Sequence, residues 1–185
     1  MMDTNQQFDE ALSLCRNIFV RKLRDYGPSW RIMRPAAVTD QLFIKAKRIR
    51  SLETKRVSAV GEGILTEFIA IVNYGIIGLI QLRLGAADSK DISVERAVEF
   101  YDAVAEQART LMIAKNHDYD EAWRGMRVLS YTDLILMKIE RVKEIEDHRG
   151  HTEISEGIDA NYMDMINYAV FGIIKLTEQS REAEC

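Results

Sequence analysis

Apolar residues recur at spacings of three and four along most of the chain, and no stretch alternates as half-buried strands do. Residues 8–25 and 94–115 show this spacing and predict two long amphipathic helices. Shorter amphipathic runs over residues 42–54 and 134–148 each follow a Thr-Asp pair, which is typical of a helix start. The pattern therefore predicts an all-α protein.

Two further stretches, about residues 60–84 and 154–177, are apolar around most of a helix circumference. Such a helix is suited either to a buried position or to a membrane. The second stretch carries Asp159 and Asp164, which a lipid-exposed helix disfavours. We therefore predict two central core helices and no association with a membrane.

The chain contains an internal duplication. Residues 22–53 align with residues 115–146 without a gap, and 12 of the 32 positions are identical, whereas chance would give about two. With one residue added, residues 62–82 align with 156–176. The shared pattern is K-x-x-D-Y-x-x-x-W-R-x-M-R, then T-D-x-x-x-x-K-x-x-R, then E-G-I and N-Y. We predict a bundle of about six helices built from two tandem three-helix repeats, residues 1–84 and 94–185, joined by a polar linker over 85–93 into one compact pseudo-symmetric unit.

Composition narrows the class of protein. The 185 residues are 47% hydrophobic, an ordinary value for a soluble globular chain. The net charge of −4 provides no general attraction for nucleic acid. Two cysteines make no disulfide framework, and the polar, acidic first residues do not form a signal peptide. We expect a cytoplasmic protein.

Five basic positions recur in both repeats, next to a recurring Asp-Tyr pair. Guanidinium and ammonium groups suit phosphate oxygens, and an aromatic side chain beside them can stack on a nucleobase. The candidate phosphate- or base-binding residues are Lys22, Asp25, Tyr26, Arg31, Arg34, Lys45 and Arg48 in the first repeat and Lys115, Asp118, Tyr119, Arg124, Arg127, Lys138 and Arg141 in the second. The alternative is a set of solvated charges and ion pairs. We expect the recurring Trp30 and Trp123 to be core residues.

The last predicted helix carries polar oxygens on one face. Glu156, Asp164 and Asn167 fall within about 80° of one another on a helical wheel. Carboxylate and amide oxygens are the ligands that Mg²⁺ prefers. The first repeat keeps Glu62 but has an alanine where Asp164 stands, so we predict a magnesium site centred on the second repeat. The alternative is a glutamate near a helix start and a hydrogen-bonded core asparagine. No catalytic residue is assigned.

The whole pattern resembles a bacterial and phage family called the nucleotide modification associated domain, over residues 22–82 and 115–176. That family is distantly similar to the MazG-like and dimeric dUTPase group of all-α nucleoside triphosphate pyrophosphohydrolases. Those enzymes hold Mg²⁺ with helix carboxylates and cleave between the α and β phosphates. The resemblance implies a helical bundle that handles a nucleotide. The enzymes typically show E-x-x-E and E-x-x-D, whereas this chain has K-x-x-R on each second helix, and D-x-x-N or A-x-x-N on the third.

The leading hypothesis is a nucleotide-binding protein that hydrolyses a standard or modified nucleotide with Mg²⁺. A second hypothesis is a non-catalytic module that binds a nucleotide or a nucleic acid, since residues 45–56 carry six bases against one acid. A third is a structural helical protein that binds a partner. The apolar third helices are also compatible with a homodimer.

Overall fold

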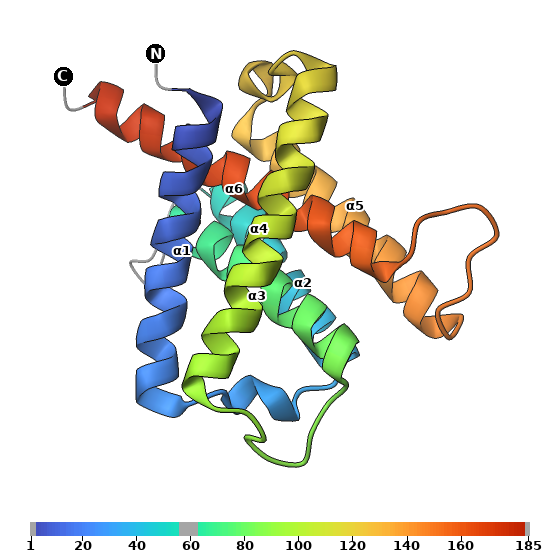
Figure 1. The fold of residues 1–185 in the computed structure, drawn as a ribbon. Coiled ribbons are helices and arrows are strands. Elements are labelled where there is room, and N and C mark those ends of the chain that lie inside the picture. Colours follow the sequence, from blue (N-terminus) through green and yellow to red (C-terminus); the bar gives the residue numbers. More distant parts are fainter. Residues whose placement is uncertain (1–2, 56–62, 184–185) are drawn as a thin grey trace.

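The computed structural model describes residues 3–55 and 63–183, and every regular element in those two ranges is helical (Figure 1). The first repeat forms α1 (Thr4–Tyr26), the 3₁₀ helix η1 (Ser29–Ile32), α2 (Pro35–Lys55) and α3 (Ile64–Leu84). The second forms α4 (Val94–Tyr119), η2 (Ala122–Gly125), α5 (Val128–Asp147) and α6 (Ile158–Ala183). The prediction of an all-α bundle of two three-helix repeats is confirmed.

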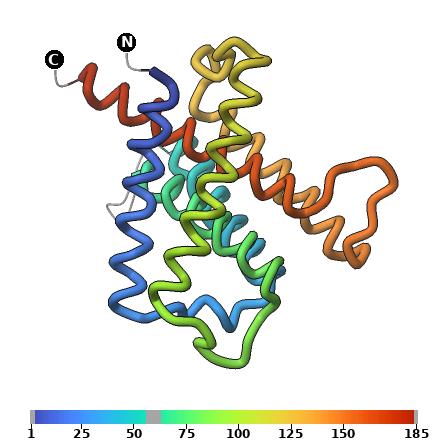
Figure 2. The backbone as a smooth tube through the Cα atoms, viewed as in Figure 1, coloured from blue at the N-terminus to red at the C-terminus, as the bar shows by residue number. Residues whose placement is uncertain are grey.

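The helices lie in three layers. The central layer is α3 crossed by α6, with α1 and α4 on one side and α2 and α5 on the other (Figure 1). In every layer, a helix of the first repeat contacts the corresponding helix of the second. The course of the chain through the layers can be followed in Figure 2. The two repeats are therefore related by an approximate twofold axis that passes through the centre of the bundle.

The central helices are apolar because they are packed on both sides. By length and composition α3 could cross a membrane, but 72% of its most apolar window is buried inside the fold. Glycines let α3 and α6 approach closely. A Cβ on Gly78 would lie 2.0 Å from Cε1 of Tyr162, and one on Gly172 would lie 3.0 Å from the ring of Phe68. These two contacts are equivalent under the pseudo-twofold axis.

The sequence suggested that the Thr-Asp pairs start helices, and this prediction is wrong. Both second helices begin four residues earlier, at Pro35 and Val128, and proline is favoured at a first helical position because it has no N–H to leave unpaired. The buried Thr39 hydroxyl donates to Glu146 Oε1 at 2.7 Å. The buried Thr132 hydroxyl donates to Glu53 Oε1 at 2.8 Å.

The aspartates of these pairs also reach across the axis. Asp133 pairs with Arg50 of the other repeat, and Asp40 lies 4.0 Å from the Lys143 ammonium. Each Thr-Asp pair thus connects the second helix of its own repeat to the second helix of the other. The duplicated T-D therefore has a structural role at the interface between the repeats.

Candidate functional site

Residues of the repeated pattern line a pocket in the second repeat. This pocket, called the second pocket after its repeat, has a volume of about 280 Å³. It lies between the end of α4, η2 and the middle of α6. It is lined by Met112, Lys115, Asn116, Tyr119, Ala122, Trp123, Met126, Tyr131, Asp164, Asn167, Tyr168 and Phe171. The site combines an aromatic wall with one acid, one base and two amides.

The first repeat has a corresponding pocket. Every lining position of the second pocket except that of Tyr131 has a counterpart that lines the first pocket, which measures about 660 Å³. The counterparts include Lys22, Tyr26, Trp30 and Asn73. The two halves of the pattern, K-x-x-D-Y-x-x-x-W and N-Y, are brought together in both repeats because the third helix packs beneath the corner that follows the first.

The acid of the second pocket is held between two lysines. Lys115 Nζ lies 2.5 Å from Asp164 Oδ1, and Lys138 Nζ lies 2.7 Å from Asp164 Oδ2. Burial raises the pKa of Asp164, but the hydrogen bonds from Lys115 and Lys138 lower it by more, so the net pKa is below its ordinary value. The group is an ionised carboxylate with two ammonium groups, and it carries one net positive charge.

Lys115 is the accessible member of this group. Its side chain is 46% exposed, whereas that of Lys138 is 8% exposed. Burial lowers the pKa of Lys115, but the hydrogen bond and charge of Asp164 outweigh it, so the net pKa is raised. Lys115 therefore stays charged at the mouth of the second pocket.

The first repeat places its acid one helical turn earlier. Glu67 corresponds to Asn161 in the repeat alignment, while Ala70 stands at the position of Asp164. The buried Glu67 carboxylate lies 2.5 Å from Arg48 Nη1 and 3.4 Å from Lys45 Nζ. Glu67 was not predicted as a partner of these bases, because its position does not align with that of Asp164. An acid in the first turn of an otherwise apolar helix was the available signal.

The two asparagines of the N-Y pairs differ in their hydrogen bonds. Asn73 Nδ2 donates to the Cys15 carbonyl at 3.1 Å, and its Oδ1 accepts from the Tyr101 hydroxyl at 2.8 Å. Asn167 is 5% exposed, and neither its amide nitrogen nor its amide oxygen has a hydrogen-bond partner within the described part of the chain. The expected core amide is thus found in the first repeat but not in the second.

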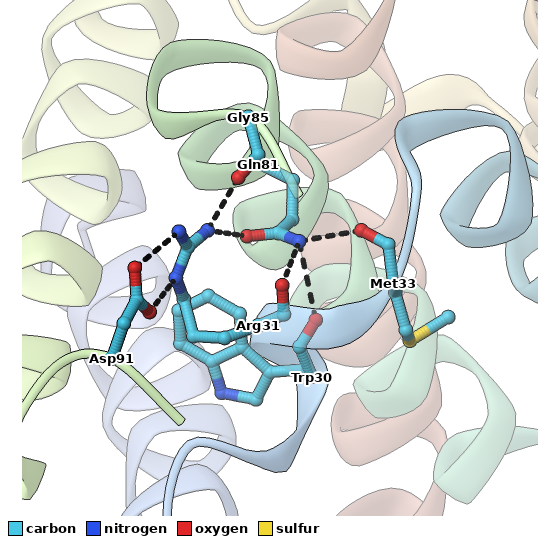
Figure 3. Close-up of polar contacts among 6 residues, drawn as sticks. All are labelled: Trp30, Arg31, Met33, Gln81, Gly85 and Asp91. Atoms are coloured by element: carbon cyan, nitrogen blue, oxygen red, sulfur yellow. Dashed lines mark hydrogen bonds and ion pairs between the residues drawn. The ribbon is translucent and has the colours of Figure 1, made fainter. Parts of the chain in front are cut away.

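Two of the predicted phosphate ligands are instead structural. Arg31 is 2% exposed and makes a bidentate ion pair with Asp91 of the linker, at 2.7 and 3.0 Å (Figure 3). It also donates to the Gly85 carbonyl at 2.7 Å and to Gln81 Oε1. The amide nitrogen of Gln81 in turn donates to three carbonyls of the corner, those of Trp30, Arg31 and Met33 (Figure 3).

Arg124 has the corresponding place in the second repeat. It pairs with Glu121 at 2.6 Å, donates to the Thr4 hydroxyl at 2.7 Å and lies over the Trp123 ring. Its carbonyl accepts from Lys175 Nζ, at the position that corresponds to Gln81. Both arginines stabilise a corner of the chain through contacts within the protein, which argues against a role as phosphate ligands.

The remaining predicted residues lie nearer to solvent. Tyr26 and Tyr119 line their pockets with 61% and 69% of their surface exposed. The side chains of Lys22, Asp25, Asp118, Arg34, Arg127 and Arg141 are also exposed. Of these, Lys22 lines the first pocket, whereas Arg141 lines a separate cleft beneath the loop between α5 and α6. Trp30 and Trp123 are buried, as predicted, although each also forms part of a pocket wall.

Three of the predicted magnesium ligands, Glu156, Asp164 and Asn167, lie in the described part of the chain and do not form a suitable set. Each oxygen of Asp164 already accepts from an ammonium group, and Glu156 lines the cleft beneath the α5–α6 loop rather than the second pocket. Within residues 3–55 and 63–183, no three Asp, Glu, His or Cys side chains are close enough to hold a metal ion. Glu62 and the end of the basic stretch over 45–56 lie outside the described residues. Among the described residues, the predicted ligands do not form the oxygen set that Mg²⁺ prefers.

Comparison with known proteins agrees with the duplicated pattern. The family described as Nucleotide modification associated domain 1 matches the chain twice, over residues 22–82 and 115–176. No curated protein and no solved structure matches the chain. The two matched segments contain most of the residues that line both pockets, and together they make up most of the chain. The protein therefore belongs to the nucleotide modification associated domain 1 family and carries two copies of its domain in tandem.

Proposed function

We propose that the second pocket binds a nucleotide, with its base inside the pocket and its phosphate at the mouth. The observation that carries the proposal is the position of Lys115, a charged and half-exposed ammonium at the rim of an aromatic pocket. An ammonium group attracts phosphate, and aromatic side chains contact the faces of a base. The family description, which associates the domain with nucleotide modification, supports this choice of ligand.

The aromatic residues of the pocket have different roles. Trp123 is stacked on Phe171 with ring centres 4.5 Å apart, and the Arg124 guanidinium lies over the same indole at 4.5 Å. These contacts make Trp123 part of the wall. Tyr119 is largely exposed and Tyr168 is half-buried. The proposal therefore assigns stacking on the base to Tyr119, with Tyr168 beside it.

The proposed activity is binding without a metal ion. Asp164 is engaged by two lysines, so the pocket has a basic group where the related pyrophosphohydrolases concentrate carboxylates. A positively charged group of this kind stabilises phosphate without help from a cation. Hydrolysis by metal-activated water would need oxygen ligands that the described residues do not bring together.

The test is a thermal-shift and calorimetry screen of standard nucleoside mono-, di- and triphosphates, with and without Mg²⁺. A ligand at about 100 times its Kd adds about 2.7 kcal/mol to the free energy of unfolding. We expect a shift that does not require Mg²⁺ and that Lys115→Gln weakens. Lys138 still pairs with Asp164 in this variant, so the fold is preserved.

Lys22→Gln is the matched control, because Lys22 occupies the corresponding place in the first pocket. It should leave the affinity of the second pocket unchanged. Tyr119→Ala should weaken binding while Tyr26→Ala should not. The proposal is refuted if no nucleotide binds, or if Lys115→Gln binds as tightly as the wild type.

A further inference from the structure

The amide of Asn167 is unusual because it is buried and unpaired. The side chain is 5% exposed, lines the second pocket, and has no hydrogen-bond partner for either of its polar atoms within residues 3–55 and 63–183. Buried amides in folded proteins are almost always hydrogen-bonded, since an unpaired buried polar group destabilises the fold. The unpaired groups therefore call for a partner that enters through the pocket.

The first repeat shows what satisfies the corresponding amide. Asn73 is held by the Tyr101 hydroxyl and the Cys15 carbonyl. The residue that corresponds to Tyr101 in the other half of the bundle is Phe8. Phe8 is fully buried and packs edge-on against Phe171, next to the second pocket, but it has no hydroxyl. The absence of one oxygen atom at position 8 removes the internal partner of Asn167 Oδ1.

On this basis, and resting on the proposed nucleotide site, we propose that Asn167 recognises the hydrogen-bonding edge of the base. Its amide offers one donor and one acceptor side by side, the arrangement that pairs with an adjacent acceptor and donor on a nucleobase. The pocket of about 280 Å³ has room for a base-sized group rather than for a whole nucleotide. The base occupies the interior and the phosphate stays near Lys115.

A second amide of the same pocket also has an unpaired atom. Asn116 lines the pocket, and its buried Oδ1 has no hydrogen-bond partner in the described part of the chain. Its counterpart in the first pocket is Leu23, which has no polar side-chain atom. The second pocket therefore offers two amides to a ligand, whereas the asparagine of the first pocket is already hydrogen-bonded within the protein. The two pockets differ in base recognition although they share a sequence pattern.

The experiment measures how much the base contributes to affinity. Calorimetry gives Kd for each standard ribo- and deoxyribonucleoside monophosphate and for ribose 5-phosphate, which has the sugar and phosphate but no base. We expect at least one nucleotide to bind the wild type 10-fold or more tightly than ribose 5-phosphate, a difference of about 1.4 kcal/mol. Asn167→Ala should abolish that difference and leave the Kd for ribose 5-phosphate unchanged.

A second variant tests the origin of the unpaired amide. Phe8→Tyr adds the hydroxyl that Tyr101 supplies to Asn73, and should occupy Asn167 and remove the preference for a base. Asn73→Ala is the control: it should lower stability but keep the preference. Circular dichroism at 222 nm checks that each variant is folded.

The outcomes separate this inference from the proposed site. If nucleotides bind but Asn167→Ala retains the full preference for a base, the inference is wrong and the proposed function stands. If ribose 5-phosphate binds as tightly as every nucleotide, the inference is wrong, and so is the placement of the base inside the pocket. If neither nucleotides nor ribose 5-phosphate bind, both the proposed function and the inference are wrong.

Discussion

The close crossing of α3 and α6 gives the sharpest prediction about stability. Gly78→Ala adds one methyl group in the middle of α3, where the new Cβ would lie 2.0 Å from Cε1 of Tyr162. That ring is 1% exposed, and its hydroxyl lies 2.8 Å from the Thr39 hydroxyl. The ring cannot move outward without losing this hydrogen bond and disturbing the contact between the repeats.

The expected loss of stability is the balance of two effects. Alanine in a helix interior is favoured over glycine by about 1 kcal/mol. Overpacking of a buried site costs about 1–3 kcal/mol, and a separation of 2.0 Å calls for the upper end of this range. The net destabilisation is therefore about 2 kcal/mol. For a chain of this size it lowers Tm by about 4–8 °C.

Urea denaturation followed by circular dichroism gives the free energy of unfolding, and a thermal melt gives Tm. Gly172→Ala is the matched variant at the symmetric position. Its Cβ would lie 3.0 Å from the Phe68 ring, so a smaller loss is expected. Gly125→Ala, where nothing lies within 4 Å, should be close to neutral. A Gly78→Ala protein as stable as Gly125→Ala would show that α3 and α6 do not cross as described.

Three other changes test the polar contacts. Asp164→Asn leaves the buried Lys138 without its counterion and should cost about 3 kcal/mol at neutral pH. The pKa of Asp164 is lowered in the folded state, so its ionised form favours folding. Urea melts across pH should therefore show the variant less stable than the wild type above the ordinary pKa of 3.8, and the difference in unfolding free energy should shrink as the pH falls below it. Burial raises the pKa of Glu146 above its ordinary 4.5, so its ionised form disfavours folding; Glu146→Gln should raise the urea midpoint at pH 7 and lose that advantage as the pH falls towards 4.5. Arg31→Met removes the buried guanidinium that donates to Asp91 and should lower the free energy of unfolding by about 2 kcal/mol. Nucleotide affinity measured by calorimetry should stay unchanged.

The fold followed largely from periodicity and repetition. Six amphipathic or apolar helical runs and an internal alignment with a single added residue were enough to predict the two three-helix repeats. Helix starts were less accessible. Thr39 and Thr132 are typical N-cap residues, but Pro35 begins α2 one turn earlier and tertiary hydrogen bonds to the other repeat determine where the threonines lie. Local sequence does not report such distant partners.

The site was predicted in part. The recurring Lys115, Tyr119 and Asn167 do line one pocket, because positions repeated in both copies have similar places in the fold. Asp164, which does not recur, lines the same pocket. The role of each charged residue could not be predicted from the sequence, because Arg31 and Lys115 are both recurring bases and only their burial in the fold distinguishes them. The partner of Asp164 was also misjudged, because a helical wheel shows which side chains share a face but not which helix covers it.

The pseudo-twofold axis within one chain has a consequence for how the two pockets can differ. In a symmetric homodimer every substitution occurs twice, so a change that suits one site alters the other as well. Here the linker keeps the two halves at a high effective concentration, as a short tether does for any pair of joined modules. Each half can then vary independently while the assembly persists. A buried acid at Glu67 in one half and at Asp164 in the other, and a hydroxyl at Tyr101 but not at Phe8, are differences that a symmetric homodimer could not hold.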